Sequence, residues 1–285
     1  MVAGHLEDWP ITTEYLERRF GPQWKQLVPI YSGADITSFE IACRAAMPQR
    51  AYDDFVRDYT AKQWGIDPQA LDAGLAGRFE VREGPDRRLK QSRWQGVPVD
   101  GYAALVERML ANTGPGGIEV HCGVDYLRCQ QHVPSWPLTI FTGAIDEFFW
   151  FEFGLLRYRA QQREHSWTRG PLVYPTVQTN IPNPAVPWVR VIEWRHMMPE
   201  IGEGTLLTNE YPYSPSDPDA YEYPFPSAAD RALYQRYRKR ADAMSSVIFA
   251  GRLGEYRYFD MDQAIARAMT LFARKVAPQL ARIRE

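Results

Sequence analysis

The strongest chemical pattern in the chain is a glycine turn between a predicted strand and a predicted helix. Residues 247–252 read VIFAGR, so the strand ends at Gly251, where the backbone can approach a cofactor, and Arg252 can meet phosphate oxygens. A helix begins near Asp260 and Met261, and its N–H groups and dipole favour a negative charge. Any unit that joins a strand to a helix through glycine gives a similar hexapeptide, so a purely structural role stays open.

Aromatic residues mark a second segment. Residues 59–65 read YTAKQWG, in which Tyr59 and Trp64 stand near a predicted helix end. The chain holds 9 Trp, 16 Tyr and 13 Phe, and aromatic rings with polar tips suit nucleobases and sugars. Such rings also fill buried helix ends, so this segment alone permits both interpretations.

Arginines would clamp a diphosphate, because a planar guanidinium can form two hydrogen bonds to one phosphate. Among the arginines that could do so are Arg78 in GRFEVR, Arg159 in GLLRYR and Arg190 in VRVIE. Taken singly, an arginine is more often a solvated surface residue.

Periodicity and turn residues predict the elements that position these side chains. Residues 9–75 indicate helices, among them a segment from Ala51 to Trp64, and alternating polar and apolar residues over 156–212 indicate an antiparallel sheet. The other predictions are strand-and-turn structure over 76–103, a helix over 103–110, strands over 118–124, 138–142 and 246–250, a loop over 213–227, and helices over 228–244 and from Met261 onward.

This order of elements indicates an α+β fold (mixed α/β) and not a regular β-α-β alternation. We expect a helical domain over residues 1–75, an antiparallel-sheet domain built from 76–117 and 148–245, and a small mixed layer built from 118–147 and 246–285.

Composition excludes several classes of protein. The net charge of −2 argues against a nucleic-acid binder. No run of residues approaches the ~18 apolar residues of a membrane helix, and no secretion signal opens the chain. Three cysteines do not make a disulfide framework, and His121-Cys122 with Cys129 and His132 does not match the spacing of a zinc loop, so no metal is predicted. We expect a cytoplasmic protein.

Taken together, the motifs resemble those of the UDP-galactopyranose mutase family, flavoenzymes that interconvert the six- and five-membered ring forms of a nucleotide sugar. The resemblance rests on YTAKQWG, on GRLGEYRYFDM at residues 251–261, and on WQGVP and TGAID between them. It implies an isomerase that converts UDP-galactopyranose to UDP-galactofuranose for polysaccharide biosynthesis. It also implies FAD as cofactor, a UDP-sugar as the bound partner and a homodimer as one assembly.

The resemblance implies roles for individual residues. Arg78, as a mobile-loop arginine, and Arg190, as its fixed partner, would balance the diphosphate charge during catalysis. The implied substrate-binding residues are Phe55, Tyr59, Trp64, Arg159, Glu210, Tyr223 and Tyr258, and the implied cofactor-binding residues are Gly251, Arg252, Tyr258, Asp260 and Met261. In the family, N5 of the reduced flavin attacks the anomeric carbon, so no side chain need be the nucleophile. The small mixed layer would be the remnant of the FAD-binding α/β domain.

The sequence departs from the family pattern at two places. No G-x-G-x-x-G occurs, although a member of the family opens with such a turn to cradle the FAD pyrophosphate. Leu89 stands where the family has Tyr near the uridine and sugar. We therefore expect the chain alone to hold FAD poorly and to expose apolar edges of its small layer unless a partner covers them. A flavin-independent nucleotide-sugar enzyme and a non-catalytic UDP-sugar-binding protein stay open as alternatives.

Overall fold

The computed structural model describes residues 5–84, 88, 92–111, 117–132, 136–198 and 202–284. The chain divides into two compact units, one formed by residues 1–87 with 137–285 and the other by residues 88–136. The predicted division into three domains stays a prediction.

The smaller unit consists of short helices joined by extended chain. It holds α5 (Gly101–Ala111), α6 (Tyr126–Cys129) and a 3-10 turn (Gln130–His132). The helix predicted over 103–110 is confirmed by α5. The strand predicted over 118–124 is wrong, because residues 117–125 form no strand. Its apolar side chains Ile118, Val120 and Val124 are each more than half exposed, and nothing in the described unit pairs with this segment.

The larger unit begins with a helical body, as predicted for residues 9–75. Its helices are α1 (Thr13–Phe20), α2 (Phe39–Arg44), α3 (Gln49–Tyr52), a π-helical turn (Asp53–Arg57) and α4 (Asp58–Trp64). Thr12 and Ser38 cap α1 and α2 by accepting hydrogen bonds from backbone N–H groups of the first turns. The core between the helices contains Ile11, Leu16, Phe39, Met47, Tyr52 and Val56.

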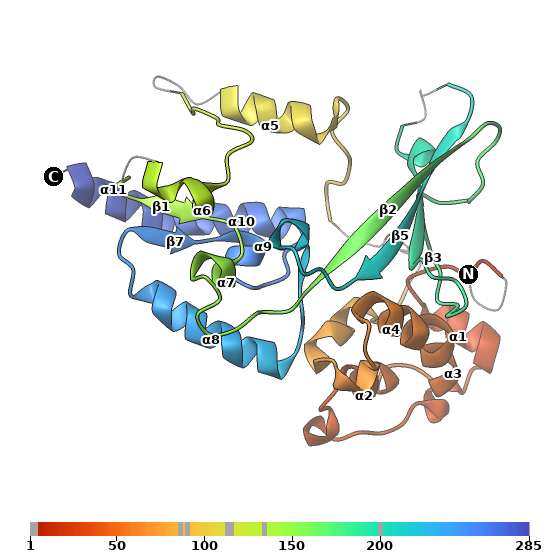
Figure 1. Ribbon diagram of the computed structural model, residues 1–285. Coiled ribbons are helices and arrows are strands. Elements are labelled where there is room, and N and C mark those ends of the chain that lie inside the picture. The colour runs from red at the N-terminus through yellow and green to blue at the C-terminus, as the bar shows by residue number, and fades with distance from the viewer. Residues whose placement is uncertain are drawn as a thin grey trace. The chain divides into compact units, whose positions relative to one another are not determined.

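A five-stranded antiparallel sheet follows, with strand order β3-β4-β5-β2-β6. The strands are β2 (Tyr158–Thr168), β3 (Gln178–Asn180), β4 (Arg190–Glu193), β5 (Thr205–Tyr213) and β6 (Tyr223–Pro224). The long β2–β5 ribbon rises beside α4 in Figure 1. This confirms the sheet predicted over 156–212.

The described residues of the segment 76–103 do not extend this sheet, contrary to the prediction. Residues Ala73–Arg78 form a 3-10 helix instead, and Arg82 makes an isolated bridge with Thr12. The local reason is Asp72, whose carboxylate accepts a hydrogen bond from the N–H of Gly74 and starts the turn. Leu75 then packs against the helical core.

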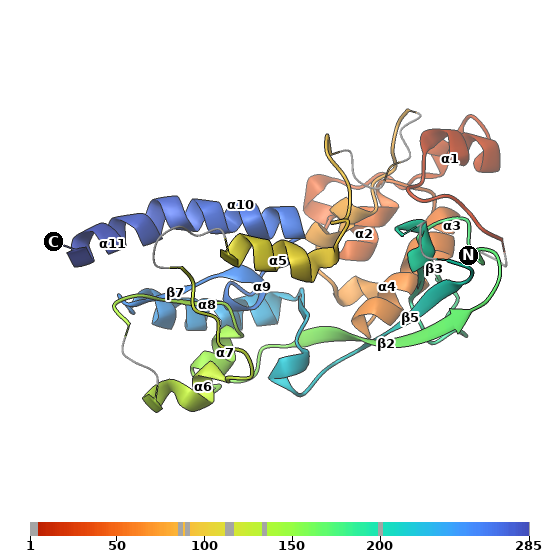
Figure 2. The ribbon, with the colours of Figure 1, turned by 90° about the horizontal axis from the view of Figure 1, so that it is seen from above.

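The third part of the larger unit is a parallel strand pair flanked by helices. β1 (Thr139–Phe141) pairs in register with β7 (Val247–Phe249), which confirms the strands predicted over 138–142 and 246–250 and their place in one layer. The flanking helices are α7 (Ile145–Phe148), α8 (Ala228–Asp242), α9 (Gly251–Gly254), α10 (Met261–Leu271), a π-helical turn (Phe272–Val276) and α11 (Ala277–Arg284). Figures 1 and 2 show α8 and α10 beside β7.

Aromatic packing and one buried carboxylate hold this layer together. The rings of Phe141, Phe148 and Phe249 lie within 4.8–5.8 Å of one another, measured between centroids. Asp146 is fully buried and accepts hydrogen bonds from the N–H of Leu156 and the hydroxyl of Tyr158, which fixes the start of β2.

The layer leaves apolar side chains exposed, as predicted. Ile140 in the middle of β1 is 50% exposed, and Ile265, Met269 and Phe272 form an exposed stripe along the C-terminal helices. Among the residues described, we find no helix with the length and apolar character needed to cross a membrane. The α+β fold class is confirmed.

The helical core gives a stability prediction. Phe39 is fully buried and its ring meets the edge of Phe79 at 5.4 Å, so Phe39→Ala should lower the free energy of unfolding by about 3–5 kcal/mol. Ile30 is fully exposed, so Ile30→Ala is the control and should change the free energy of unfolding by less than about 0.5 kcal/mol. Urea denaturation measures both, and equal effects would contradict the assigned core.

Candidate functional site

One face of the five-stranded sheet carries a row of charges across three neighbouring strands. Arg163 on β2 lies opposite Glu210 on β5, which lies opposite Arg190 on β4. Side chains at paired positions share a face of the sheet. The Nε atoms of both arginines lie 3.2 Å from the Glu210 carboxylate, and Glu210 is only 5% exposed. The Arg163 contact is a hydrogen bond, whereas Arg190 contributes charge at ion-pair distance without hydrogen-bond geometry.

Arg163 also binds a second carboxylate. Its Nη1 and Nη2 atoms donate to the two oxygens of Glu222 at 2.9 and 3.0 Å. This bidentate contact, opposed by burial and aided by the charge of Glu210, raises the pKa of Arg163. Burial by itself lowers the pKa of Arg190, but Tyr59 and Glu210 raise it on balance. Both guanidinium groups therefore stay charged.

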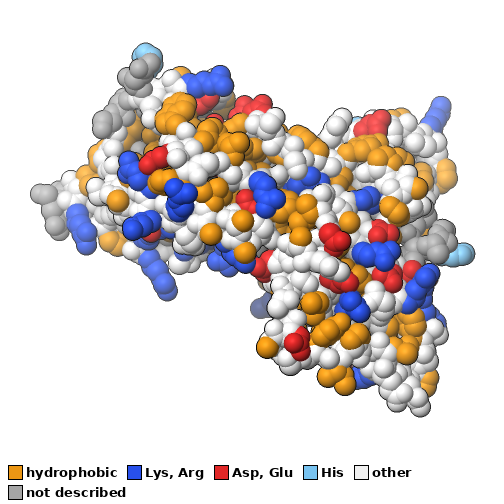
Figure 3. Space-filling model, turned by 60° about the horizontal axis from the view of Figure 1, so that its bottom comes forward, with side chains coloured by type: hydrophobic (Ala, Val, Ile, Leu, Met, Phe, Trp, Pro, Cys, Tyr) orange, Lys and Arg blue, Asp and Glu red, His pale blue; other side chains and the backbone are white. Residues whose placement is uncertain are grey.

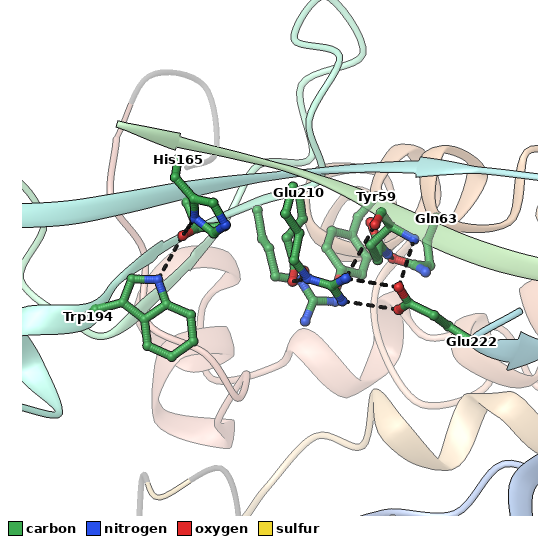
Figure 4. Close-up of polar contacts among 10 residues, drawn as sticks. Tyr59, Gln63, His165, Trp194, Glu210 and Glu222 are labelled. Carbon is green, nitrogen blue, oxygen red and sulfur yellow. Dashed lines mark hydrogen bonds and ion pairs between the residues drawn. The ribbon is translucent and has the colours of Figure 1, made fainter. Parts of the chain in front are cut away.

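Helix α4 lies over this polar face. The Tyr59 hydroxyl accepts a hydrogen bond from Arg190 Nη2 at 3.0 Å, and Gln63 Oε1 accepts one from Gln161 Nε2 at 3.1 Å. Figure 4 shows Tyr59 and Gln63 turned toward Glu210 and Glu222. Further along the same face, the Thr208 hydroxyl bonds His165 Nδ1 at 2.8 Å and Trp194 Nε1 at 2.7 Å.

Arg159 fastens the end of α4 to the sheet. It donates to the carbonyl oxygens of Gln63 and Lys62 at 2.9 and 3.2 Å and to the Ser214 hydroxyl at 2.7 Å. Gly65 ends the helix with φ +70°, and a Cβ there would come within 3.0 Å of Arg159 Nη1. Burial lowers the pKa of Arg159. This arginine, predicted to bind substrate, thus binds the C-terminal carbonyls of a helix.

Lys62 holds the loop before β4. Its ammonium donates to the carbonyl oxygens of Ile181, Asn183, Val186 and Trp188. Burial lowers the pKa of Lys62 to about 8, so the amine stays mainly protonated at pH 7. An ammonium has three N–H donors for these four acceptors. The loop is therefore bound to the same helix that presents Tyr59.

A stack of rings and guanidinium groups borders the charged row. The rings of Tyr223 and Tyr258 are nearly parallel, with centroids 5.9 Å apart. Arg78 Cζ lies 3.9 Å and Arg252 Cζ 4.5 Å from the centroid of Tyr258. Tyr223 follows Glu222 directly, which joins the stack to the row. Burial raises the pKa of Tyr223 to about 12, so its hydroxyl stays protonated.

The guanidinium groups of the two arginines in the stack differ in their hydrogen-bond partners. Arg252 donates to the carbonyl oxygens of Glu222 at 3.0 Å and Phe259 at 2.7 Å. Arg78 is exposed, and its guanidinium has no hydrogen-bond or ion-pair partner within the part of the chain that the structure describes. Arg78 is therefore the side chain best placed to meet an incoming anion.

The structure brings together most of the residues singled out in the sequence. Those in the row, in the stack or at their border are Tyr59, Arg78, Arg159, Arg190, Glu210, Tyr223, Arg252 and Tyr258. Phe55 lies apart, in the helical core against Trp9 and Tyr15, and Trp64 is half-buried with its edge on Phe225. Leu89 lies outside the described residues.

Sequence analysis missed Lys62, Gln63, Gln161, Arg163 and Glu222. The alternation of Arg159, Gln161 and Arg163 along one strand was the available signal, because alternate residues of a strand share a face. The contacts of Lys62 gave no local signal, since its four acceptors lie more than 110 residues along the chain.

The described residues make only part of an FAD site. Gly251 has φ +79°, which suits a backbone that turns closely under a ligand. The Arg252 donors instead meet protein carbonyls, and a capping box between Asp260 and Gln263 closes the start of α10, where Met261 is 63% exposed. No G-x-G-x-x-G turn occurs in the sequence. These residues alone therefore do not fit the FAD pyrophosphate.

Known nucleotide-sugar mutases are similar in sequence to this chain. A family model described as UDP-galactopyranose mutase matches residues 54–258. A dTDP-fucopyranose mutase of Escherichia coli is 30% identical over 82% of this chain and 63% of its own length. A probable UDP-galactopyranose mutase of Klebsiella pneumoniae is 29% identical, over 81% and 59%.

The chain spans between 56% and 63% of the length of these relatives and of a UDP-galactopyranose mutase from Mycoplasma pneumoniae. The crystal structure of a reduced UDP-galactopyranose mutase shares the fold, with a TM-score of 0.63 at 13% identity over 85% of this chain and 69% of that one.

The Lys62 contacts generate a prediction. Lys62→Met keeps the apolar stem but removes the donor to four carbonyl oxygens, so it should lower the free energy of unfolding by about 1–3 kcal/mol. Backbone hydrogen exchange over residues 181–188 should accelerate. Lys239→Met, on the exposed side of α8, is the control. Unchanged exchange over 181–188 would contradict the assigned role.

Proposed function

We propose that this chain, which belongs to the UDP-galactopyranose mutase family, acts in the ring contraction of a nucleotide sugar, from UDP-galactopyranose to UDP-galactofuranose. The observation that carries the proposal is the charged row of Arg163, Glu210 and Arg190, bordered by the Tyr223–Tyr258 stack with the exposed Arg78.

The charges of this site suit a diphosphate. The charged row and the stack contain four guanidinium groups, those of Arg78, Arg163, Arg190 and Arg252, and two carboxylates, those of Glu210 and Glu222. They leave two positive charges in excess, and a nucleotide-sugar diphosphate carries two negative ones. Arg78 and Arg190 would stabilise the charge on the leaving nucleoside diphosphate as the bond to the sugar breaks.

The aromatic groups provide faces for the rings of the substrate. Tyr223 and Tyr258 present a flat stack beside the arginines, and Tyr59 lies beneath Arg190 with its hydroxyl engaged. Stacking on such rings suits both the nucleobase and the sugar. Phe55 contributes indirectly, because it packs in the core of the helical body to which α4 belongs.

We also propose FAD as the cofactor of the active enzyme, in which it would supply the nucleophile. Gly251, Arg252, Asp260 and Met261 would form its closing side only together with a pyrophosphate-binding turn that these 285 residues do not contain. A homodimer and a cytoplasmic location belong to the same proposal. The exposed stripe of Ile265, Met269 and Phe272 supports an assembly with another chain.

Two observations favour other candidates. The Escherichia coli relative is a dTDP-fucopyranose mutase, which favours a thymidine diphosphate sugar as the alternative substrate. The incomplete FAD site favours a UDP-sugar-binding protein without catalysis, or an enzyme that works without flavin. Calorimetry with UDP and dTDP side by side separates the bases, and the isomerase assay with added reduced FAD separates enzyme from binding protein.

Replacing either arginine should weaken UDP binding. Arg78→Ala and Arg190→Ala should each cost about 1.5–3 kcal/mol of binding free energy, the range for hydrogen bonds to charged groups. Arg169→Ala is the matched control, because Arg169 is 84% exposed and follows the last residue of β2, outside the charged row. Calorimetry measures all three, and an unchanged UDP affinity in both site variants would refute the proposed diphosphate site.

The purified chain should hold little flavin. Because the pyrophosphate turn is missing from the sequence, we expect a nearly colourless protein with far less than one FAD per chain. Absorption spectra of the protein as purified, and after dialysis against excess FAD, measure this. Stoichiometric FAD that survives dialysis would show that the chain forms a complete flavin site.

A further inference from the structure

A cavity of about 320 Å³ opens beside β7, away from the charged row and the tyrosine stack. The last turn of α8, the start of β7 and α11 line it. Val247 and Ile248 form part of its wall, and the backbone turn at Met244 and Ser245 closes one end. No residue of the proposed nucleotide-sugar site is among those that line it. Its volume is at the lower end of the range for small-molecule sites, roughly 300–1,000 Å³.

The polar lining of this cavity is strongly basic. Arg238, Arg274, Lys275 and Arg282 line it, and the one acidic side chain among the lining residues is Asp242. Asp242 binds Arg238 through both carboxylate oxygens, so this pair is already neutral. The other three cations have no hydrogen-bond or ion-pair partner among the residues that the structure describes. They leave three uncompensated positive charges in a chain whose net charge is −2.

This basic character extends over the neighbouring surface. In Figure 3, Lys and Arg side chains outnumber acidic ones over the part of the face that α8 and the C-terminal helices form. A concave site lined by one sign of charge raises the local concentration of the opposite ion. The cavity therefore favours an anion of two or more charges.

Gln279 adds a second recognition group. Its Oε1 atom is buried and has no hydrogen-bond donor among the described residues, although the side chain lines the cavity. A buried acceptor without a donor costs free energy, so rotation of the Gln279 amide toward a ligand that brings an O–H or N–H group would relieve that cost. The cavity thus offers cations and one acceptor against a partly apolar wall.

We propose that this cavity binds a small phosphate monoester that carries a hydroxyl group near its phosphate, the class to which sugar phosphates belong. A phosphate monoester carries about −1.5 to −2 charges at pH 7, which suits the three free cations. Its hydroxyl groups can donate to Gln279 Oε1 while the carbon skeleton lies on Val247 and Ile248. The size of the cavity fits a single sugar ring better than a nucleotide.

The test uses ribose 5-phosphate, inorganic phosphate and ribose as probes with the full chain. Calorimetry should show ribose 5-phosphate binding, inorganic phosphate binding about tenfold more weakly, and no heat with ribose. NMR shifts of backbone amides should be confined to the cavity, with Ser245 and Gln279 among them. The double variant Arg274→Gln/Lys275→Gln should weaken ribose 5-phosphate binding by about tenfold or more.

Three controls decide the outcome. Arg236→Gln/Lys239→Gln removes the same charge from α8 outside the cavity and should change the affinity by less than about twofold. Gln279→Met should reduce the affinity of ribose 5-phosphate to that of inorganic phosphate. Arg78→Ala removes an exposed arginine of the proposed nucleotide-sugar site and should leave ribose 5-phosphate binding unchanged, so the result is independent of that site.

The proposal is overturned if ribose 5-phosphate gives neither heat nor NMR shifts, or if both charge variants weaken binding equally. Loss of binding in Arg78→Ala would place the ligand at the nucleotide-sugar site and overturn the proposal as well. Equal affinities for ribose 5-phosphate and inorganic phosphate, unaffected by Gln279→Met, would overturn the assignment of an organic ligand.

Discussion

The arrangement of the candidate site depends on one buried carboxylate, that of Glu210, held between the guanidinium groups of Arg163 and Arg190. A buried charge without its partner costs about 3–5 kcal/mol, so each member of this row constrains the others. The constraint sets the register of three strands, because the charges meet only where β2, β5 and β4 pair as they do. Burial of the Glu210 carboxylate also requires another element to cover that face of the sheet and exclude water.

Helix α4 provides this cover, and its contacts explain why the face can be polar. Sheets usually bury an apolar face, and a polar face under a helix is stable only when its groups are hydrogen-bonded. Tyr59 binds Arg190, Gln63 binds Gln161, and Arg159 returns from the sheet to the carbonyl groups at the end of the helix. Burying so many polar groups costs free energy of folding. Proteins accept such costs mainly at functional sites, so this face is suited to a charged ligand.

Much of the fold could be predicted from local sequence patterns. The errors of this prediction have physical causes. Helical periodicity located α4, within the segment predicted from Ala51 to Trp64, and alternation located the strands between residues 156 and 212. The apolar alternation at Ile118 and Val120 predicted a strand that lacks a pairing neighbour in its unit. Asp72 turned the following segment into a 3-10 helix through a side-chain hydrogen bond that a strand pattern does not reveal.

The site itself could be predicted only in part. Motifs located Tyr59, Arg190 and Tyr258, whereas Lys62 and Arg163 find their partners across long stretches of sequence, and no local pattern contains that information. Arg159 shows the converse. Its motif predicted a ligand contact, but its donors meet the end of a helix.

The central claim is that a nucleoside diphosphate lies on the charged row beneath α4. A crystal of the full chain soaked with 5-bromo-UDP tests this most directly, because the anomalous signal of bromine locates the base independently of the protein atoms. The account predicts a bromine peak beside the tyrosine stack, with the diphosphate within hydrogen-bonding distance of Arg78 and Arg190. A bromine peak in the basic cavity beside β7, with none near the tyrosine stack, would contradict it.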